Sequence, residues 1–384
     1  MDTCNRFTSR LSNSKPLLRW YISYGASGFP QAGGPITFSL IALSIGASAA
    51  GGATMILTMT LAQIACAVPI VRVGRHLNPV SFLRILVFFR TCALVAIALL
   101  AAWEAPLFWL AGFAAVAGSV NGAVYGHLRL LLSSLTHTND LPRALGIAAT
   151  LNELTFVLAP VAASGIGSIS PMLALLCFAG IGAIPVLLLP SAPFVQKADA
   201  QGGSSSLFNG AISLWLLCAA AGSAIVAATE IGAVSLALKF GYEPVFAFLF
   251  TVPLCLASVL GGVWVSVRNR ISSEKAVTVQ LFIAATGALI TALQLSVTTT
   301  IVGTILMGLV IAPLGTYYSL KLDQLAPPVR RAEVFALLRT ANASGIIIAS
   351  SALTLLPLNW ALMTVTLIML SVASTATIVL RKKG

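Results

Sequence analysis

Charged side chains are scarce in this sequence of 384 residues, in which only 8% are Asp, Glu, Lys or Arg and 58% are hydrophobic. A soluble globule of this length must cover a large surface with polar groups, and 22 basic and 10 acidic residues are too few for that. The mean hydropathy of +0.98 therefore argues against a water-soluble enzyme. At about 20 apolar residues per crossing, the chain has room for on the order of a dozen transmembrane helices. We predict an all-α membrane protein.

Side chains that build metal sites and disulfides are also few. Only 3 histidines and 6 cysteines occur, and five of the cysteines lie inside hydrophobic runs at irregular spacings. This pattern indicates small apolar side chains and predicts neither a disulfide framework nor a metal site. The sequence also lacks a phosphate-binding glycine loop and a nucleophile elbow. We expect no cofactor, no metal and no enzymatic activity.

The net charge of +12 comes from basic residues in small groups between apolar stretches. Nucleic-acid binding would need a basic face with interleaved aromatic residues, which the sequence lacks. Nearly all Lys and Arg fall at the chain ends and in connections that share one side of the bilayer if every span crosses. By the positive-inside rule, we predict both termini in the cytoplasm and a multi-pass protein of a plasma membrane, of the bacterial inner-membrane type.

Hydropathy windows of about 19 residues predict twelve transmembrane helices in two sets of six. The first set lies near residues 17–44, 48–71, 80–102, 106–131, 143–167 and 170–190, and the second near 208–237, 244–267, 276–298, 300–323, 331–354 and 357–380. A stretch rich in Pro, Gly, Ser and Gln separates the sets and is typical of a flexible linker. The predicted parts are a cytoplasmic N-terminal segment, a first bundle, a cytoplasmic linker and a second bundle, at residues 1–16, 17–190, 191–207 and 208–384.

The two predicted bundles resemble each other at corresponding positions. The fifth span contains T-L-N at residues 150–152, and the eleventh contains T-A-N at residues 340–342. Short basic connections follow the second and the eighth spans. These connections contain Arg72, Gly74, Arg75, Arg268 and Arg270. The matches indicate a tandem duplication that gives two six-helix pseudo-repeats.

Six plus six spans, a polar central linker and a basic turn after spans two and eight together resemble the major facilitator superfamily of secondary transporters. The resemblance covers the whole chain. The superfamily's G-x-x-x-D-R-x-G-R-[RK] turn is similar to A-V-P-I-V-R-V-G-R-H at residues 67–76, where Val71 replaces the aspartate. In the superfamily that acid helps to latch the two halves on the cytoplasmic side. The resemblance thus makes the five residues of the basic connections a candidate cytoplasmic gate, with a latch that is weaker or built differently.

A second resemblance lies in the stretch N-E-L-T-F-V-L-A-P, which is similar to the fifth span of small prokaryotic facilitators. Pro160 stands where exporters of the superfamily often carry a Gly-Pro motif, and Ala159 replaces the glycine. This half-present motif favours export.

Two acids lie within predicted spans. Glu153 follows Arg143 by ten residues, which places it roughly 15 Å along the fifth helix and near the bilayer midplane. Glu230 lies in the outer half of the seventh span. Because an ionised side chain in hydrocarbon costs about 2.5–3.5 kcal/mol, such carboxyl groups favour protonation and can carry protons. We predict both acids as proton-coupling residues. The alternatives are a protonated, structural Glu153 and an interfacial Glu230 wetted from outside.

Other polar side chains within the predicted spans are candidates for a substrate cavity. They are Gln31, Asn121, Arg129, Asn152 and Asn342. Arg129 is also a candidate partner of Glu153 or of an anionic substrate, unless its long side chain extends to the membrane interface. The same extension to the interface is expected of Arg84, Arg90 and Arg339.

Proline and glycine shape the predicted helices. Residues 28–35, with Pro30 and Pro35, predict an interruption of the first span, and Pro160 predicts one in the fifth, since proline frees backbone groups that neighbours or cavity water must satisfy. The first segment either lines the transport pathway or forms a packing kink. Glycines at four-residue spacing in the fourth span predict close helix packing. They are Gly118, Gly122 and Gly126.

The resemblance and the intramembrane acids together predict proton-coupled export of a small, partly apolar molecule by alternating access. The partners of this transporter would be the molecule, protons and the bilayer, and we expect a monomer. One alternative keeps the fold and makes the chain a proton symporter or uniporter that imports a metabolite or siderophore. An alternative of a different class is a non-transporting membrane sensor or assembly factor that reuses the fold.

Overall fold

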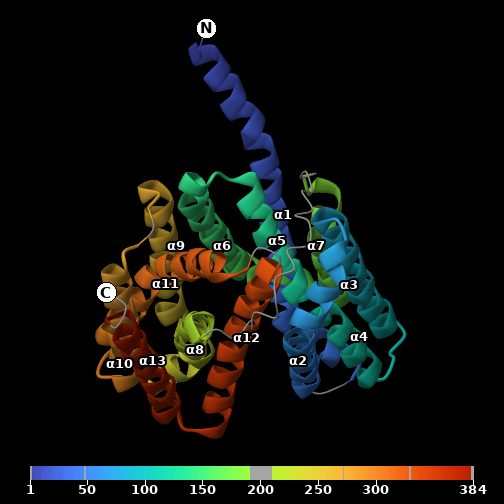
Figure 1. Cartoon of the computed structure of the whole chain (residues 1–384). Coiled ribbons are helices and arrows are strands. Elements are labelled where there is room, and N and C mark those ends of the chain that lie inside the picture. The colour runs from blue at the N-terminus through green and yellow to red at the C-terminus, as the bar shows by residue number, and fades with distance from the viewer. Residues whose placement is uncertain (1, 47–48, 191–209, 271, 328–329, 382–384) are drawn as a thin grey trace. The chain divides into compact units, whose positions relative to one another are not determined.

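A computed structural model describes residues 2–46, 49–190, 210–270, 272–327 and 330–381, which form helices joined by short connections (Figure 1). The elements up to the polar stretch are α1 (Asp2–Ser44), α2 (Ala49–Val73), η1 (Gly74–His76), α3 (Pro79–Ala102), α4 (Leu107–Ser119), α5 (Asn121–Leu135), η2 (Thr138–Asp140), α6 (Leu141–Gly167) and α7 (Pro171–Leu188). Those after it are α8 (Gly210–Lys239), η3 (Pro244–Ala247), α9 (Phe248–Arg268), α10 (Glu274–Leu293), α11 (Val297–Leu325), α12 (Arg331–Leu355) and α13 (Leu358–Arg381).

Polar residues in the connections fix where several helices begin. The Oδ1 atom of Asn78 accepts a hydrogen bond from the backbone N–H of Val80 at 3.0 Å, and Pro79 opens α3. Ser170 caps α7 in the same way. Ser296 forms a capping box with Thr299 at the start of α11. Each cap satisfies N–H groups that the first turn of a helix leaves without a partner.

Eleven segments of the described residues are long and apolar enough to cross a membrane, with α4 and α5 together forming one of them. These segments agree closely with the second to twelfth predicted spans, because the length of a hydrophobic run defines both the predicted span and the membrane-crossing helix. The first predicted span lies within α1 but is not among the eleven, because Ser, Gly, Pro and Gln interrupt its apolar run. The described part of the chain is thus an all-α protein with the composition of a multi-pass membrane protein.

The prolines of α1 and α6 do not end these helices. Helix α1 continues through residues 28–35 with Pro30 and Pro35 inside it, and α6 continues past Pro160. The expected interruption is therefore absent from the described backbone of both helices. A proline removes a single backbone hydrogen bond, and the neighbouring turns keep theirs, so the helix continues.

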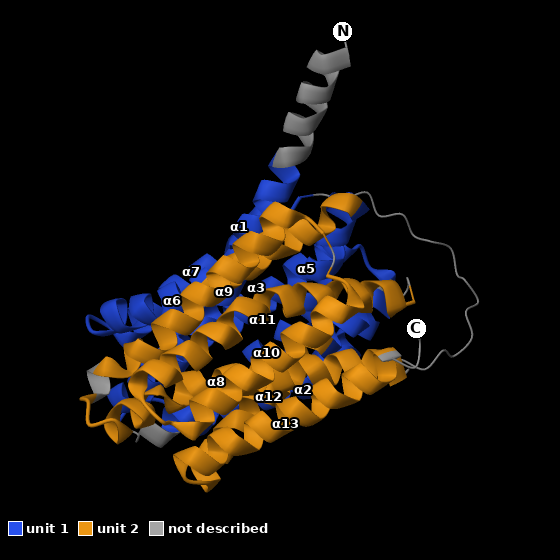
Figure 2. Ribbon diagram, turned by 90° about the vertical axis from the view of Figure 1, so that its left-hand side faces the viewer, with its two compact units in different colours: residues 1–138, 154–202, 328–337 blue, residues 139–153, 203–327, 338–384 orange. Residues whose placement is uncertain are grey.

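The chain divides into two compact units (Figure 2). Unit 1 contains residues 1–138, 154–202 and 328–337, and unit 2 contains residues 139–153, 203–327 and 338–384. The first part of α6 thus belongs to unit 2 and its remainder to unit 1, whereas α12 has the opposite division. The predicted linker at 191–207 lies outside the described residues. The boundaries of the two predicted bundles remain a prediction.

Each unit is held together by close helix packing. In unit 1, α1 packs on α2 and α7, and α2 packs on α4; in unit 2, α11 packs on α9 and α10, and α13 packs on α8 and α10. A Cβ atom on Gly118 would lie 2.0 Å from the Met59 carbonyl oxygen, and one on Gly122 would lie 2.7 Å from Ala67. The prediction that the glycines of the fourth span allow close packing is confirmed.

Candidate functional site

The first part of α6 packs on α9 through a stripe of small residues in unit 2. A Cβ atom on Gly146 would lie 2.5 Å from Oγ of Ser266, and one on Gly262 would lie 2.5 Å from Oγ1 of Thr150. Residues three and seven apart share one face of a helix. Glu153 therefore lies on the same face of α6 as Gly146 and Thr150, which is the face toward α9.

Glu153 meets other polar side chains of unit 2 on this face. The hydroxyl group of Ser258, which is 1% exposed, lies close to the carboxyl group of Glu153. Glu230 of α8 lies near enough to Glu153 for their charges to interact, and the thiol of Cys255 lies near both acids. Glu153 is partly buried, while Glu230 is exposed. The two acids that the sequence singled out thus both belong to unit 2, within range of each other's charge.

The predicted cavity residues fall into both units. Asn152 and Asn342 belong to unit 2 and are partly buried. In unit 1, Nε2 of Gln31 donates to Oε1 of Gln63 at 3.4 Å, and Asn121 is 7% exposed. Their role in a substrate cavity remains a prediction.

Arg90 differs from its expected placement. Its side chain is only 4% exposed and donates hydrogen bonds to the carbonyl oxygens of Ser27 and Gly182, both at 2.9 Å, and to Oδ1 of Asn121 at 3.4 Å. The expectation that Arg90 extends to the membrane interface is therefore wrong. The two carbonyl acceptors lie on α1 and α7, so the guanidinium group joins these two helices.

Arg129 is also buried, at 3% exposure, and does not extend outward. Its guanidinium carbon lies 4.6 Å from the centre of the Phe335 ring on α12, and Nη1 donates to Oγ of Ser133 at 2.6 Å. Arg129 and Phe335 both belong to unit 1, whereas Glu153 belongs to unit 2. The cation–π contact gives Arg129 a packing partner that the sequence did not indicate.

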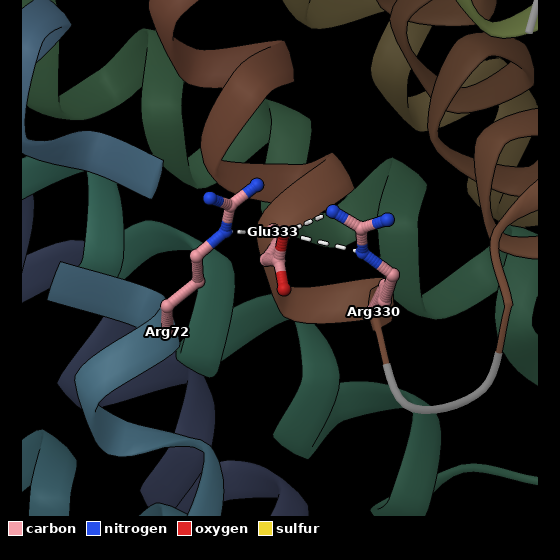
Figure 3. A network of polar contacts seen from close by, with 3 residues as sticks. All are labelled: Arg72, Arg330 and Glu333. Carbon is pink, nitrogen blue, oxygen red and sulfur yellow. Dashed lines mark hydrogen bonds and ion pairs between the residues drawn. The ribbon is translucent and has the colours of Figure 1, made fainter. Parts of the chain in front are cut away.

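The basic connection after α2 meets an acid on α12 within unit 1 (Figure 3). Nε of Arg72 lies 3.3 Å from Oε2 of Glu333, and Nη2 of Arg330 lies 3.1 Å from the same oxygen. The side chain of Glu333 is 1% exposed, so two guanidinium groups enclose a buried carboxylate. Gly74 lies two residues after Arg72 in the same turn. A Cβ atom there would lie 2.1 Å from the ring of Phe82, so only glycine fits without a clash.

The other basic connection is arranged differently. Arg268 and Arg270 are exposed, and the guanidinium group of Arg268 lies over the ring of Trp264 at 5.0 Å. The side chain of Arg75 lies outside the described residues. Among the five predicted gate residues, Arg72 is the one for which the described chain shows an ion pair.

Sequence reasoning missed Glu333. The signal that could have found it is R-R-A-E at 330–333, an acid in the first turn of a predicted helix, beside two arginines in a chain with 10 acids. An acid at that position is also favoured by the dipole of its own helix. Because Val71 leaves the turn after α2 without an acid, a search for a compensating carboxylate would have led to α12.

The described residues contain no group of three or more His, Cys, Asp or Glu placed to hold a metal ion.

The described helices share the fold of solved transport proteins, among them members of the major facilitator superfamily. The chain is similar to a bacterial homologue of the iron transporter ferroportin, at 15% identity over 96% of this chain and 98% of that chain, with a TM-score of 0.76. It is also similar to the proton:xylose symporter XylE, at 10% identity over 94% and 95% of the two chains, with a TM-score of 0.74. The human organic anion transporter TETRAN matches at 12% identity over 95% and 98%, with a TM-score of 0.72.

No protein family and no curated protein match the sequence. The likeness to these three solved structures, at 10–15% identity, therefore establishes the fold alone.

Proposed function

We propose that this chain is a proton-coupled secondary transporter that exports a small, partly apolar molecule by alternating access. In this proposal it works as a monomer in a plasma membrane, with both termini in the cytoplasm. The observation that carries the proposal is the pair of carboxyl groups, Glu153 on α6 and Glu230 on α8, whose charges interact within unit 2. Two acids that share one apolar setting disfavour double ionisation, so one of them readily takes up a proton.

The two acids differ in access, which gives them different tasks. Glu230 has the more exposed side chain of the two, while Glu153 is partly buried on the α9 face of α6 and close to the point where α6 passes from unit 2 to unit 1. Protonation of Glu153 removes a charge from that point. A change of charge there can favour one arrangement of the units over another, which is what coupling requires.

The direction of transport rests on the Ala159–Pro160 pair, which resembles half of an exporter motif. The competing proposal is proton symport of a metabolite into the cell, which the similarity to the proton:xylose symporter favours. Right-side-out and inverted vesicles separate the two, because a symporter accumulates its substrate in right-side-out vesicles when the outside is made acidic. A substrate is first found by comparing metabolite accumulation in cells with and without the protein.

The proposal is tested with purified protein in proteoliposomes under an imposed pH gradient. We expect Glu153→Gln to abolish proton-driven flux of that substrate and Glu230→Gln to change its pH profile, while both variants remain folded and inserted. The matched control is Glu243→Gln, which removes an exposed acid at the connection after α8 and should leave flux unchanged. Full proton-driven flux in Glu153→Gln would remove this acid from the mechanism.

A further inference from the structure

The last turn of α7 binds two arginines that come from other helices of unit 1. Nε of Arg19 on α1 donates a hydrogen bond to the carbonyl oxygen of Leu188 at 3.0 Å, and Nη2 of Arg84 on α3 donates to that of Leu189 at 3.1 Å. The dipole of α7 favours cations at this end of the helix. Two positive charges are thereby brought to one place, where they repel each other and together attract an anion.

The described acids of unit 1 do not neutralise these two arginines. The acids of this unit whose side chains the structure describes are Glu104 and Glu333. Glu333 is paired with Arg72 and Arg330. Glu104 follows the opposite end of α3, roughly 30 Å from Arg84 along that helix. Within the described part of unit 1, the charge at the end of α7 is therefore left without an acid.

The arginines lie where lipid headgroups meet the protein. The apolar segment Pro79–Ala102 begins shortly before Arg84, and the apolar segment Pro171–Leu188 ends at the carbonyl groups that the arginines bind. The ends of membrane-crossing helices lie at the level of the headgroups. Two leucines beside the arginines have exposed side chains, with Leu18 at 59% and Leu187 at 80%. A phospholipid has the matching order of groups, a phosphate above apolar chains.

We propose that the end of α7 binds the phosphate group of an anionic phospholipid through Arg19 and Arg84. A guanidinium group has five N–H donors in a planar fork that fits phosphate oxygens, and the described chain engages one donor of each arginine. Nε of Arg84 is enclosed and has no hydrogen-bond partner among the described residues. Basic pockets between transmembrane helices bind anionic headgroups. Phosphate from solution has the same charge but lacks the acyl chains that the exposed leucines can contact.

Native mass spectrometry of the full chain in detergent measures this binding, with dioleoyl phosphatidylglycerol and dioleoyl phosphatidylcholine as probes. The first molecule of phosphatidylglycerol should bind about 25-fold more tightly than phosphatidylcholine, since each arginine contributes about fivefold. Arg19→Gln and Arg84→Gln should each lower this preference about fivefold, and the double variant should abolish it. Arg84→Lys should keep more of the preference than Arg84→Gln, because lysine retains the charge but not the fork.

Lys321→Gln is the matched control, since it removes a cation that Glu274 already pairs at 3.3 Å, and it should leave the lipid preference unchanged. Equal losses in Lys321→Gln and Arg84→Gln would show a general effect of net charge and overturn the site. Inorganic phosphate at the same concentration should not displace phosphatidylglycerol. If it does, the ligand is a free anion and the lipid assignment is wrong.

Two further variants keep the test decisive. Arg19→Gln replaces Arg84→Gln if the latter does not fold, because Arg19 is exposed. Asp199, an acid of unit 1, lies outside the described residues. If the unchanged protein binds both lipids equally and Asp199→Asn gains a preference for phosphatidylglycerol, this acid neutralises the arginines and the lipid site is overturned.

Discussion

The starts of α6 and α12 occupy equivalent places in the two sets of helices but are held by different forces. At the start of α6, Oδ1 of Asn269 accepts a hydrogen bond from the backbone N–H of Arg143 at 2.9 Å, and Nδ2 of Asn269 donates to Asp140 at 3.3 Å. At the start of α12, a buried carboxylate lies between two guanidinium groups. One contact is a cap supplied by a neighbouring helix, and the other is a charge cluster.

The packing beneath these contacts is nevertheless alike. A glycine allows close approach in both places, Gly146 against Ser266 and Gly126 against Ala332, and in both the added Cβ atom would lie 2.5 Å from its neighbour. Each segment also belongs to the unit that does not hold the rest of its helix. The comparison teaches that two helix starts can share their packing while their electrostatics differ.

The largest effect is expected from reversing the buried charge at the start of α12. Glu333→Lys places a third cation beside Arg72 and Arg330 in a buried position, and should lower the free energy of unfolding by about 3–5 kcal/mol. Denaturant unfolding in mixed micelles measures this change. Glu274→Lys, at an exposed ion pair, should change it by about 0–1 kcal/mol. Equal losses in the two variants would show that burial of the cluster is unimportant.

A destabilisation of intermediate size should be equal at the starts of α6 and α12, where a glycine allows close packing. Gly126→Val and Gly146→Val each force a side chain into a gap that lacks room for it, and each should destabilise the protein by about 1–3 kcal/mol. Gly112→Val is the control, because nothing lies within 4 Å of a Cβ atom there. The same unfolding measurement applies, and a large difference between the first two variants would contradict the shared packing.

The smallest effect concerns the neutral cap of α6. Asn269 has a left-handed backbone with φ of 46°, so Asn269→Gly keeps the backbone and removes only the side-chain hydrogen bonds. We expect a loss of about 1 kcal/mol and faster hydrogen exchange at residues 141–150. Glu104→Gly, at another left-handed position with φ of 52°, should not destabilise the protein. If exchange at 141–150 stays unchanged, Asn269 does not hold this helix.

Much of the fold follows from the sequence because hydrophobic run length is a local property. The second to twelfth spans agree with the helices within a few residues, and the glycines of the fourth span pack as their spacing indicates. Arg90 shows the limit of such reasoning. Its long side chain was expected to extend to the membrane interface, but acceptors from α1 and α7 hold its guanidinium group inside the protein.

The sequence alone determined that this chain crosses a bilayer many times and that Glu153 and Glu230 lie within its apolar spans. Only the tertiary structure decided that these two acids of unit 2 lie within range of each other's charge, and that Glu333 pairs with Arg72 across 261 residues. The physical reason is that burial in a membrane depends on the sum of nearby side chains along one helix, whereas an ion pair depends on how separate helices pack. Charge placement is encoded locally, and charge pairing is not.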